Sequence, residues 1–351
     1  MAGVVFLHTL PFAAAFHKSP ESLLKLDYFY LLAKFSTIGF FLVSGFLMGS
    51  GLHRHDPVRY MTRRLQTVFL PWLFWFLIYA GIQLTYMRAQ LLAQHFSVFW
   101  TASQLTRIMF ETTYWFVPNL IFAQIILLAC RRFLNSLRFG AALGVISLLH
   151  GAYLHWISHT PDGHTGAFFG FIFYLWLGSY AAEHHEALQQ KMERIPAYAL
   201  LLATLLTFVL SLVEVYVLVG RLGVTPLMNT LRIGNQLYSV SMVLLLYKFR
   251  RSFAPSWLNV RATTFGIYLL HPYLIFFFRM YVTRLLGHFL PSVDLTTDSP
   301  LLLCGIYLAC FAVVYAGSTF FSSLLSRFRR LRWSVGMFPK PVRQPDLVAA
   351  G

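Results

Sequence analysis

Ten apolar stretches alternate with short polar segments along this chain of 351 residues. A helix needs about 20 mostly apolar residues to cross the hydrocarbon core of a bilayer. By this criterion the predicted spans are residues 3–16, 28–51, 66–87, 114–130, 139–156, 167–184, 196–219, 229–248, 263–284 and 300–325. We therefore predict an all-α membrane protein, a polytopic bundle of about ten transmembrane helices.

The first span differs from the others because it is visibly short. Only seven residues precede His8, Pro11 lies within the stretch, and the basic start of a secretory signal peptide is missing. We expect this first helix to be truncated, and a cleaved signal peptide is the alternative. Residues 1–326 then form one transmembrane domain, and residues 327–351 form a basic cytoplasmic tail.

The composition supports a membrane protein and excludes several other classes. Apolar residues make up 58% and charged residues 11% of the chain, and the mean hydropathy is +0.63. Soluble domains carry about 25% charged residues. The three cysteines, Cys130, Cys304 and Cys310, lie in or beside apolar runs without a CxxC pair, so neither a disulfide framework nor a zinc site is predicted.

The net charge of +16 is concentrated in alternate connections between the spans. The connections after the second, fourth, sixth and eighth spans, with the tail, contain Arg54, Arg59, Arg63, Arg64, Arg131, Arg132, Arg138, Lys191, Arg194, Lys248, Arg250, Arg251, Arg261, Arg327, Arg329, Arg330, Arg332, Lys340 and Arg343. The opposite connections contain only Lys18, Lys25, Arg88, Arg107 and Arg221. Cytoplasmic loops are enriched in Lys and Arg, so we predict that both termini are cytoplasmic and that nucleic acid is not a partner.

Five charged residues fall within the apolar spans or at their ends. We interpret Arg232 and Arg284, near predicted ends, as side chains that reach the membrane interface. Lys34, Glu214 and Arg279 lie deeper, where a charge usually faces a partner or a polar cavity. Glu214 is a candidate partner for Lys34 or Arg279.

Five segments together resemble a known family. They are GFFLVSGFLMGSG at 39–51, RYMTRRLQTVFLPWLFWFLIY at 59–79, YWFVPNLIFAQIILL at 114–128, GAFFGFIFYLWLGSYAAEH at 166–184 and FGIYLLHPYLIFFF at 265–278. In this order they resemble the acyltransferase-3 family of integral membrane acyltransferases. The resemblance covers nearly the whole chain and implies the same ten-span plan.

The resemblance also implies a catalytic residue in the first span. His8 matches the family's catalytic His, and a neutral imidazole is suited to taking a proton from a hydroxyl that attacks a thioester. We expect His8 to act as general base or acyl carrier, assisted by Lys34. The alternative is a His that is only hydrogen-bonded within the bundle. The family's Arg, about ten residues upstream of this His, would fall before Met1.

A second implied feature is the cofactor-binding pair Arg63 and Arg64. Family members place Arg-x-x-Arg shortly before the Pro of the third span, and here Thr67 replaces the second Arg. The guanidinium group can bind phosphate oxygens through two hydrogen bonds, so the resemblance implies contact with the phosphates of acyl-CoA. The alternative is that these residues only anchor the loop at the cytosolic face.

Further residues are candidates for the substrate pocket or for packing. The candidate pocket residues are Trp115, Phe116, His271 and Arg279. Trp115 and Phe116 are interpreted equally well as core aromatics, and His271 as structural. The sequence around Ser44 lacks the GxSxG pattern of a serine hydrolase, so Ser44 and Gly45 are expected to permit close helix packing.

Four histidines, His150, His155, His159 and His164, follow one another at the end of the fifth span. HExxH is absent, and we predict no metal site. A contact with a proton or a sugar at the outer face is one alternative, and solvated loop histidines are the other.

These observations lead to one main hypothesis and two alternatives. The main hypothesis is an enzyme of the bacterial inner membrane, an O-acetyltransferase that moves an acyl group from cytosolic acetyl-CoA to a hydroxyl of a glycan or lipid-linked acceptor. Acyl-CoA is a donor substrate, and no permanently bound cofactor is expected. The alternatives are a transporter or flippase for a polysaccharide or lipid-linked sugar, and an inactive relative.

Overall fold

The computed structural model describes residues 1–13, 16, 19, 30–54, 56–93, 97–158, 161–222, 229–250, 260–282, 288 and 297–338. These residues fold into helices joined by short connections, and no β-strand forms among them. This confirms the predicted all-α fold.

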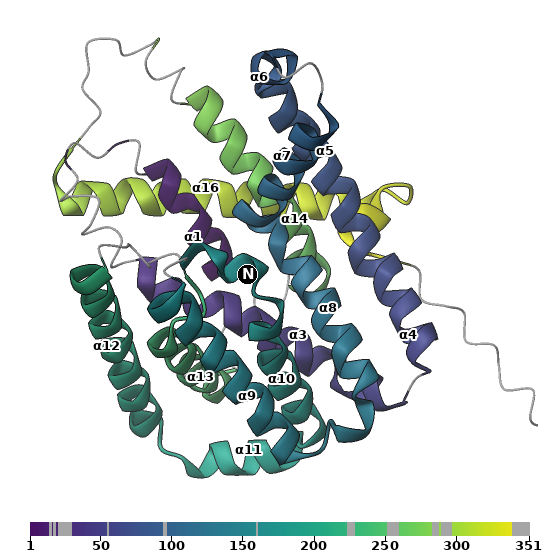
Figure 1. Ribbon diagram of the computed structural model, residues 1–351, viewed down its shortest axis with the longest axis vertical. Coiled ribbons are helices and arrows are strands. Elements are labelled where there is room, and N and C mark those ends of the chain that lie inside the picture. The colour runs from purple at the N-terminus through teal and green to yellow at the C-terminus, as the bar shows by residue number, and fades with distance from the viewer. Residues whose placement is uncertain are drawn as a thin grey trace, which may run out of the picture.

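The helices are labelled in Figure 1. The α-helices are α1 (Ala2–Ala13), α3 (Phe35–Arg54), α4 (Pro57–Arg64), α5 (Leu70–Tyr86), α6 (Arg88–Ala93), α7 (Val98–Glu111), α8 (Phe116–Ala129), α9 (Leu137–Ala152), α10 (Ile172–Glu183), α11 (His185–Arg194), α12 (Ala197–Leu222), α13 (Ile233–Lys248), α14 (Val260–Phe277) and α16 (Pro300–Arg327). The π-helical segments are η2 (Leu65–Phe69), η5 (Tyr153–Ile157) and η9 (Phe278–Val282). The 3₁₀ segments are η3 (Thr113–Trp115), η4 (Arg131–Phe133), η6 (Pro161–Gly166), η7 (Phe168–Phe171) and η10 (Arg332–Val335).

Each of the ten predicted spans coincides with a helix in the described part of the chain. Five helices there are long and apolar enough to cross a membrane, and six if α7 and α8, which meet at a bend of 81°, form one span. The protein is therefore an integral membrane protein. The parts of the predicted spans at 14–15, 28–29 and 283–284, and residues 339–351 of the predicted tail, lie outside the described residues.

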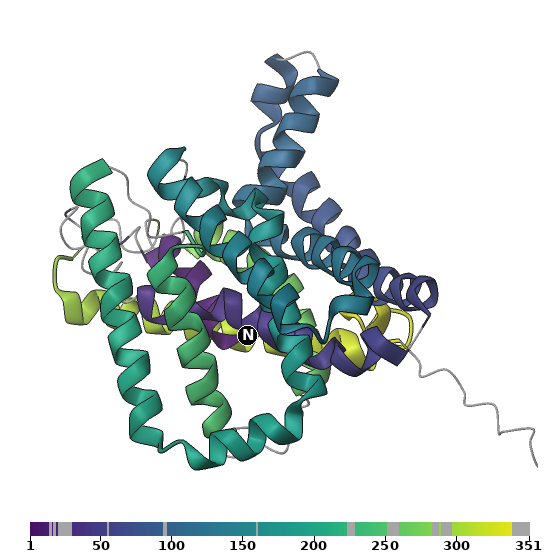
Figure 2. The ribbon, with the colours of Figure 1, turned by 60° about the horizontal axis from the view of Figure 1, so that its bottom comes forward.

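Helices α8, α9, α10, α12 and α13 run side by side through the body, and α16 lies across their direction, packed on α14 and α1 (Figure 1). The short α11 joins α10 to α12 at one end of this bundle. Helices α6 and α7 were not expected from hydropathy. They form a hairpin that projects from the body beyond α5 (Figure 2).

The centre of the bundle is the contact between α3 and α10. A Cβ atom built on Gly45 would lie 2.1 Å from the carbonyl oxygen of Leu175, and one built on Gly178 would lie 2.0 Å from the carbonyl oxygen of Leu42. Only glycine permits backbones to approach this closely, as in the small-residue contacts of membrane helices. The predicted packing role of Gly45 is thus confirmed.

The outer faces of the bundle are apolar. Leu201, Leu202, Leu205 and Leu206 on α12 are all exposed, although each would favour a buried position in a soluble protein. This face matches the apolar tails of lipid.

Candidate functional site

The structure brings two histidines from distant parts of the chain together. α1, which carries His8, packs against α14, which carries His271, through a cluster that includes Val5 and Ile267. The two imidazole centroids lie 5.5 Å apart. His271 is fully buried, whereas His8 keeps part of its surface accessible. Of the two histidines, His8 is therefore the one with accessible surface.

The hydrogen bonding of His271 defines its proton positions. Its Nδ1 lies 3.1 Å from the carbonyl oxygen of Ile267, and because a carbonyl only accepts, Nδ1 carries the proton. The neutral ring then has a lone pair on Nε2, which is buried without a partner among the described residues. The next residue, Pro272, lies inside α14 and donates no backbone hydrogen bond. His271 therefore presents a free acceptor in the interior beside His8.

Lys34 lies close enough to His8 for their charges to interact. The helical turn at residues 30–33 ends at Lys34 and α3 begins at the next residue, so the side chain projects from a break in the helix. Lys34 is only 4% exposed, and its Nζ donates to the hydroxyl of Tyr30 at 3.1 Å and lies 5.0 Å from the centroid of that ring. The two predicted catalytic residues therefore lie near one another.

Arg232 corrects one interpretation made from the sequence. Its side chain is fully buried, so it does not reach the membrane interface as expected. Its Nη1 donates to the carbonyl and hydroxyl oxygens of Ser211 at 3.1 and 3.2 Å. The charge of Arg232 also acts on Lys34, so both cations belong to one interior cluster.

Glu214 does not form an ion pair with Lys34 or Arg279 in the described part of the structure. Its two carboxylate oxygens instead accept the backbone N–H groups of Ile233 and Gly234, at 2.8 and 2.7 Å. These are the first N–H groups of α13, where a negative charge is favoured by the helix dipole. Glu214 thus caps α13 from the neighbouring α12.

A series of contacts between aromatic rings connects the histidine pair to the centre of the bundle. The rings of His271 and Tyr268 are 6.1 Å apart, and Tyr268 lies 5.8 Å from Phe116. Phe116 in turn packs on Phe41 at 4.5 Å. Trp115 is buried behind Phe116, with its ring 5.2 Å from Phe171. Phe116 thus contacts Tyr268, which in turn contacts His271. Trp115 packs beside Phe116.

The predicted phosphate-binding pair lies on α4. Asp56 caps this helix through the Arg59 N–H, and Arg63 and Arg64 occupy its last turn, where cations are favoured. Arg63 is exposed, and Arg64 is half-buried with its Nε donating to the Tyr60 hydroxyl at 3.0 Å. This end of the molecule is separated from Lys34 by α3, whose 20 residues span about 30 Å.

Helix α5, which follows Arg64 after the short segment η2, runs toward the histidine pair. The carbonyl of Trp75, on α5, accepts a hydrogen bond from the hydroxyl of Tyr273, two residues after His271. Trp75 lies eleven positions after Arg64, which corresponds to roughly 16 Å along a helix. The hydroxyl of Thr67 bonds to the Arg63 carbonyl at 2.8 Å, so it is engaged with its own helix.

Arg279 is the predicted pocket residue that the structure separates from the others. It lies in η9, two helical turns beyond His271, and its side chain is exposed. Arg284 lies outside the described residues.

The histidines at the end of the fifth span are mainly interior. His155 and His164 are buried rather than solvated, His150 is half-buried, and His159 lies outside the described residues. No group of three His, Cys, Asp or Glu side chains in the described part of the chain could hold a metal ion.

Three residues of this region were not selected from the sequence as site residues. Tyr30 lies one turn before Lys34 and Tyr268 nearly one turn before His271, so helical spacing alone would have placed each beside its charged or titratable neighbour. Arg232 gave no such signal, because its position at the end of an apolar span also fits an interfacial arginine.

The fold and the site define a helical integral membrane protein with a histidine pair and buried cations in its interior. The family model described as an acyltransferase domain matches residues 1–319. The chain therefore belongs to the acyltransferase-3 family, as its motifs suggested. No curated protein and no solved structure matches it. Membership of an acyltransferase family favours an enzyme over the transporter alternative.

Proposed function

We propose that this protein transfers an acetyl group from acetyl-CoA to a hydroxyl of a glycan or lipid-linked acceptor in the bacterial inner membrane, with both termini in the cytoplasm. The observation that carries the proposal is the pairing of His8 with His271 in the interior of an acyltransferase-family bundle. At this separation, the free lone pair of His271 can accept a hydrogen bond from a protonated His8 inside a largely apolar region.

In the proposed reaction His8 takes the proton of the acceptor hydroxyl as its oxygen attacks the thioester carbonyl. The new carbon–oxygen bond forms, the carbon–sulfur bond breaks, and the CoA thiolate receives the proton back from His8. His271 is a positioning residue, because the lone pair on its Nε2 can accept a hydrogen bond from the imidazolium that forms at His8. Lys34 lies near enough to stabilise negative charge on the carbonyl oxygen.

The donor is expected to approach from the end of the molecule that carries α4. Arg63 and Arg64 would hold the CoA phosphates there, and the pantetheine arm would extend along α5 toward His271. The distance of roughly 16 Å from Arg64 to the level of Trp75 suits an extended arm better than direct contact of the nucleotide with the histidines.

The test is acetyl transfer from labelled acetyl-CoA by the purified protein in proteoliposomes supplied with lipid-linked glycan. His8→Ala is expected to lower the rate by roughly 10²- to 10⁴-fold, the usual contribution of a general base. His150→Ala, which removes a half-buried imidazole from α9, is the matched control and should retain the parent rate. Equal rates for His8→Ala and the unsubstituted protein would remove His8 from the mechanism.

A further inference from the structure

The group formed by Tyr30, Lys34 and Arg232 has more positive charge and more hydrogen-bond donors than the described residues around it satisfy. The three residues come from the segment just before α3 and from the turn before α13, and these two helices pack together. The Tyr30 hydroxyl accepts from Lys34, and it also lies within electrostatic range of Arg232. Tyr30 therefore neighbours both cations.

One hydrogen-bond donor of the Arg232 side chain has no acceptor among the described residues. Its Nη1 is occupied by Ser211, and its Nε donates to the carbonyl of Asn229 at 3.4 Å. Its Nη2 is buried and has no acceptor within the described structure. The side-chain nitrogen of Asn229, in the same turn, is buried and unpartnered as well. Guanidinium and amide nitrogens only donate, so both require an acceptor.

The charges in this group do not cancel. No carboxylate of the described residues lies within 4.0 Å of Lys34 or Arg232. Glu214 is the nearby anion, but α13 already occupies both of its oxygens. Within the described part of the chain, two cations against one carboxylate leave an excess of one positive charge. A buried charge without a counterion is costly within a membrane domain, so a bound anion would stabilise the charged form of this group.

We propose that Tyr30, Lys34 and Arg232 bind an oxyanion of the acceptor, either a phosphate ester or a carboxylate. The Nη2 of the Arg232 guanidinium group would donate a hydrogen bond to this anion, and the ammonium group of Lys34 is a second cation beside His8. This inference rests on the proposed function, because it identifies the acceptor as an anion held next to the acyl-transfer centre.

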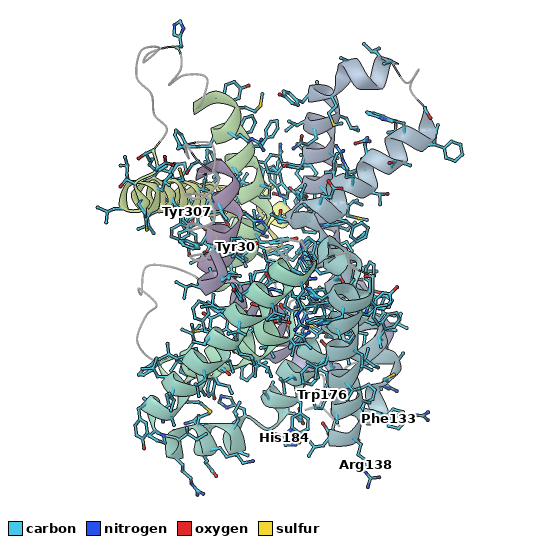
Figure 3. All side chains as sticks on the ribbon, turned by 60° about the vertical axis from the view of Figure 1, so that its left-hand side comes forward. Tyr30, Phe133, Arg138, Trp176, His184 and Tyr307 are labelled. Atoms are coloured by element: carbon cyan, nitrogen blue, oxygen red, sulfur yellow. The ribbon has the colours of Figure 1, made fainter. Side chains whose placement is uncertain are left out.

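The location distinguishes this site from the one proposed for CoA. In Figure 3, Tyr30 lies far from His184 and Arg138, which mark the opposite end of the bundle. Arg63 and Arg64 lie beyond the other end of α3, about 30 Å from its start. The CoA phosphates therefore bind elsewhere, and the anion at Lys34 and Arg232 belongs to the acceptor. Basic pockets between membrane helices bind lipid phosphates in this way.

The experiment measures binding in detergent on the full chain carrying His8→Ala, so that no turnover occurs. Farnesyl phosphate is titrated against farnesol, and glucuronate against glucose, by isothermal calorimetry. We expect one anion to bind more tightly than its neutral counterpart, and the arm that responds identifies a lipid phosphate or a sugar carboxylate. Failure of both anions to exceed their neutral counterparts would overturn the proposal.

Variants then assign the binding to these residues. Lys34→Met and Arg232→Gln should each weaken binding of the anion by at least about thirtyfold, the lower range for losing one partner of a buried charge pair. Lys34→Arg keeps the charge and should retain binding. Lys248→Met, at the other end of α13, is the matched control, because its Nζ bonds to the Met192 carbonyl instead. Unchanged binding in folded Lys34→Met would contradict the proposal even if Arg232→Gln failed to fold.

The two proposals fail in different ways. Anion binding without any acetyl transfer would support this site and contradict the proposed function. Acetyl transfer to a neutral acceptor, at rates unaffected by Arg232→Gln, would contradict this site and leave the proposed function intact.

Discussion

The contact between α3 and α10 permits a prediction with a defined magnitude. Gly45→Ala would place a Cβ atom 2.1 Å from the Leu175 carbonyl oxygen and 3.0 Å from the Ser179 nitrogen. Ordinary van der Waals contacts of a Cβ begin at 3.4 Å, so the two helices would have to separate by about 1.3 Å at this point. Both obstructing atoms are backbone atoms, so no rotation of a side chain can relieve the overlap.

The size of the effect follows from a comparison with a second glycine. Gly81, on α5, has no atom within 4 Å of a Cβ built on it, so Gly81→Ala changes helix propensity without changing packing. The propensity gain, about 1 kcal/mol, is shared by both variants and cancels in their difference. What remains is the overpacking penalty, so Gly45→Ala should be less stable than Gly81→Ala by about 1–3 kcal/mol.

The assay is reversible unfolding in mixed micelles, followed by circular dichroism as the denaturing detergent is increased. Gly178→Ala produces the reciprocal overlap with the Leu42 carbonyl. The double variant should therefore lose less stability than the sum of the two single losses, because the first substitution has already separated the helices. Equal stability of Gly45→Ala and Gly81→Ala would refute the close contact.

Three other predictions follow from individual hydrogen bonds and charges. Arg64→Ala should raise KM for acetyl-CoA by roughly tenfold with little change in kcat, whereas Arg59→Ala should leave both unchanged in steady-state assays of thiol release. Trp72→Phe removes the donor to the Tyr114 carbonyl at 3.0 Å and should lower the free energy of unfolding by about 1–3 kcal/mol, measured in mixed micelles. Gln236→Leu leaves four buried hydrogen bonds unmade and should destabilise by at least a similar amount, and a neutral result would show that these groups find other partners.

Hydropathy predicted the helices well because lipid imposes a strict condition on the backbone. Every buried N–H and C=O group must bond within its own segment, so an apolar stretch of sufficient length becomes a helix. The packing role of Gly45 was also predictable from small residues in an apolar span. The hairpin of α6 and α7 was not, because Arg107 and Glu111 lower its hydropathy below that of a span.

The site was less predictable because it depends on contacts between distant segments. Nothing in the local sequence pairs His8 with His271, and only the packing of α1 on α14 brings them together. Arg232 was wrongly placed at the membrane interface by the sequence analysis. Hydropathy gives the position of a residue along a span, but it does not show in which direction the preceding turn folds. Its turn folds inward, with the Asn229 side chain accepting the Leu231 N–H at 2.7 Å, and so carries the guanidinium group into the bundle.

The most direct test of the account is chemical rescue of His8→Ala by free imidazole during acetyl transfer. If His8 supplies the base, imidazole added to the folded variant should restore transfer by at least about tenfold, a fraction of the 10²–10⁴ that a general base contributes. His150→Ala should not respond. A folded His8→Ala that transfers acetyl at the parent rate, or that stays inactive at every imidazole concentration while still binding acetyl-CoA, would contradict the assignment of His8 as the base.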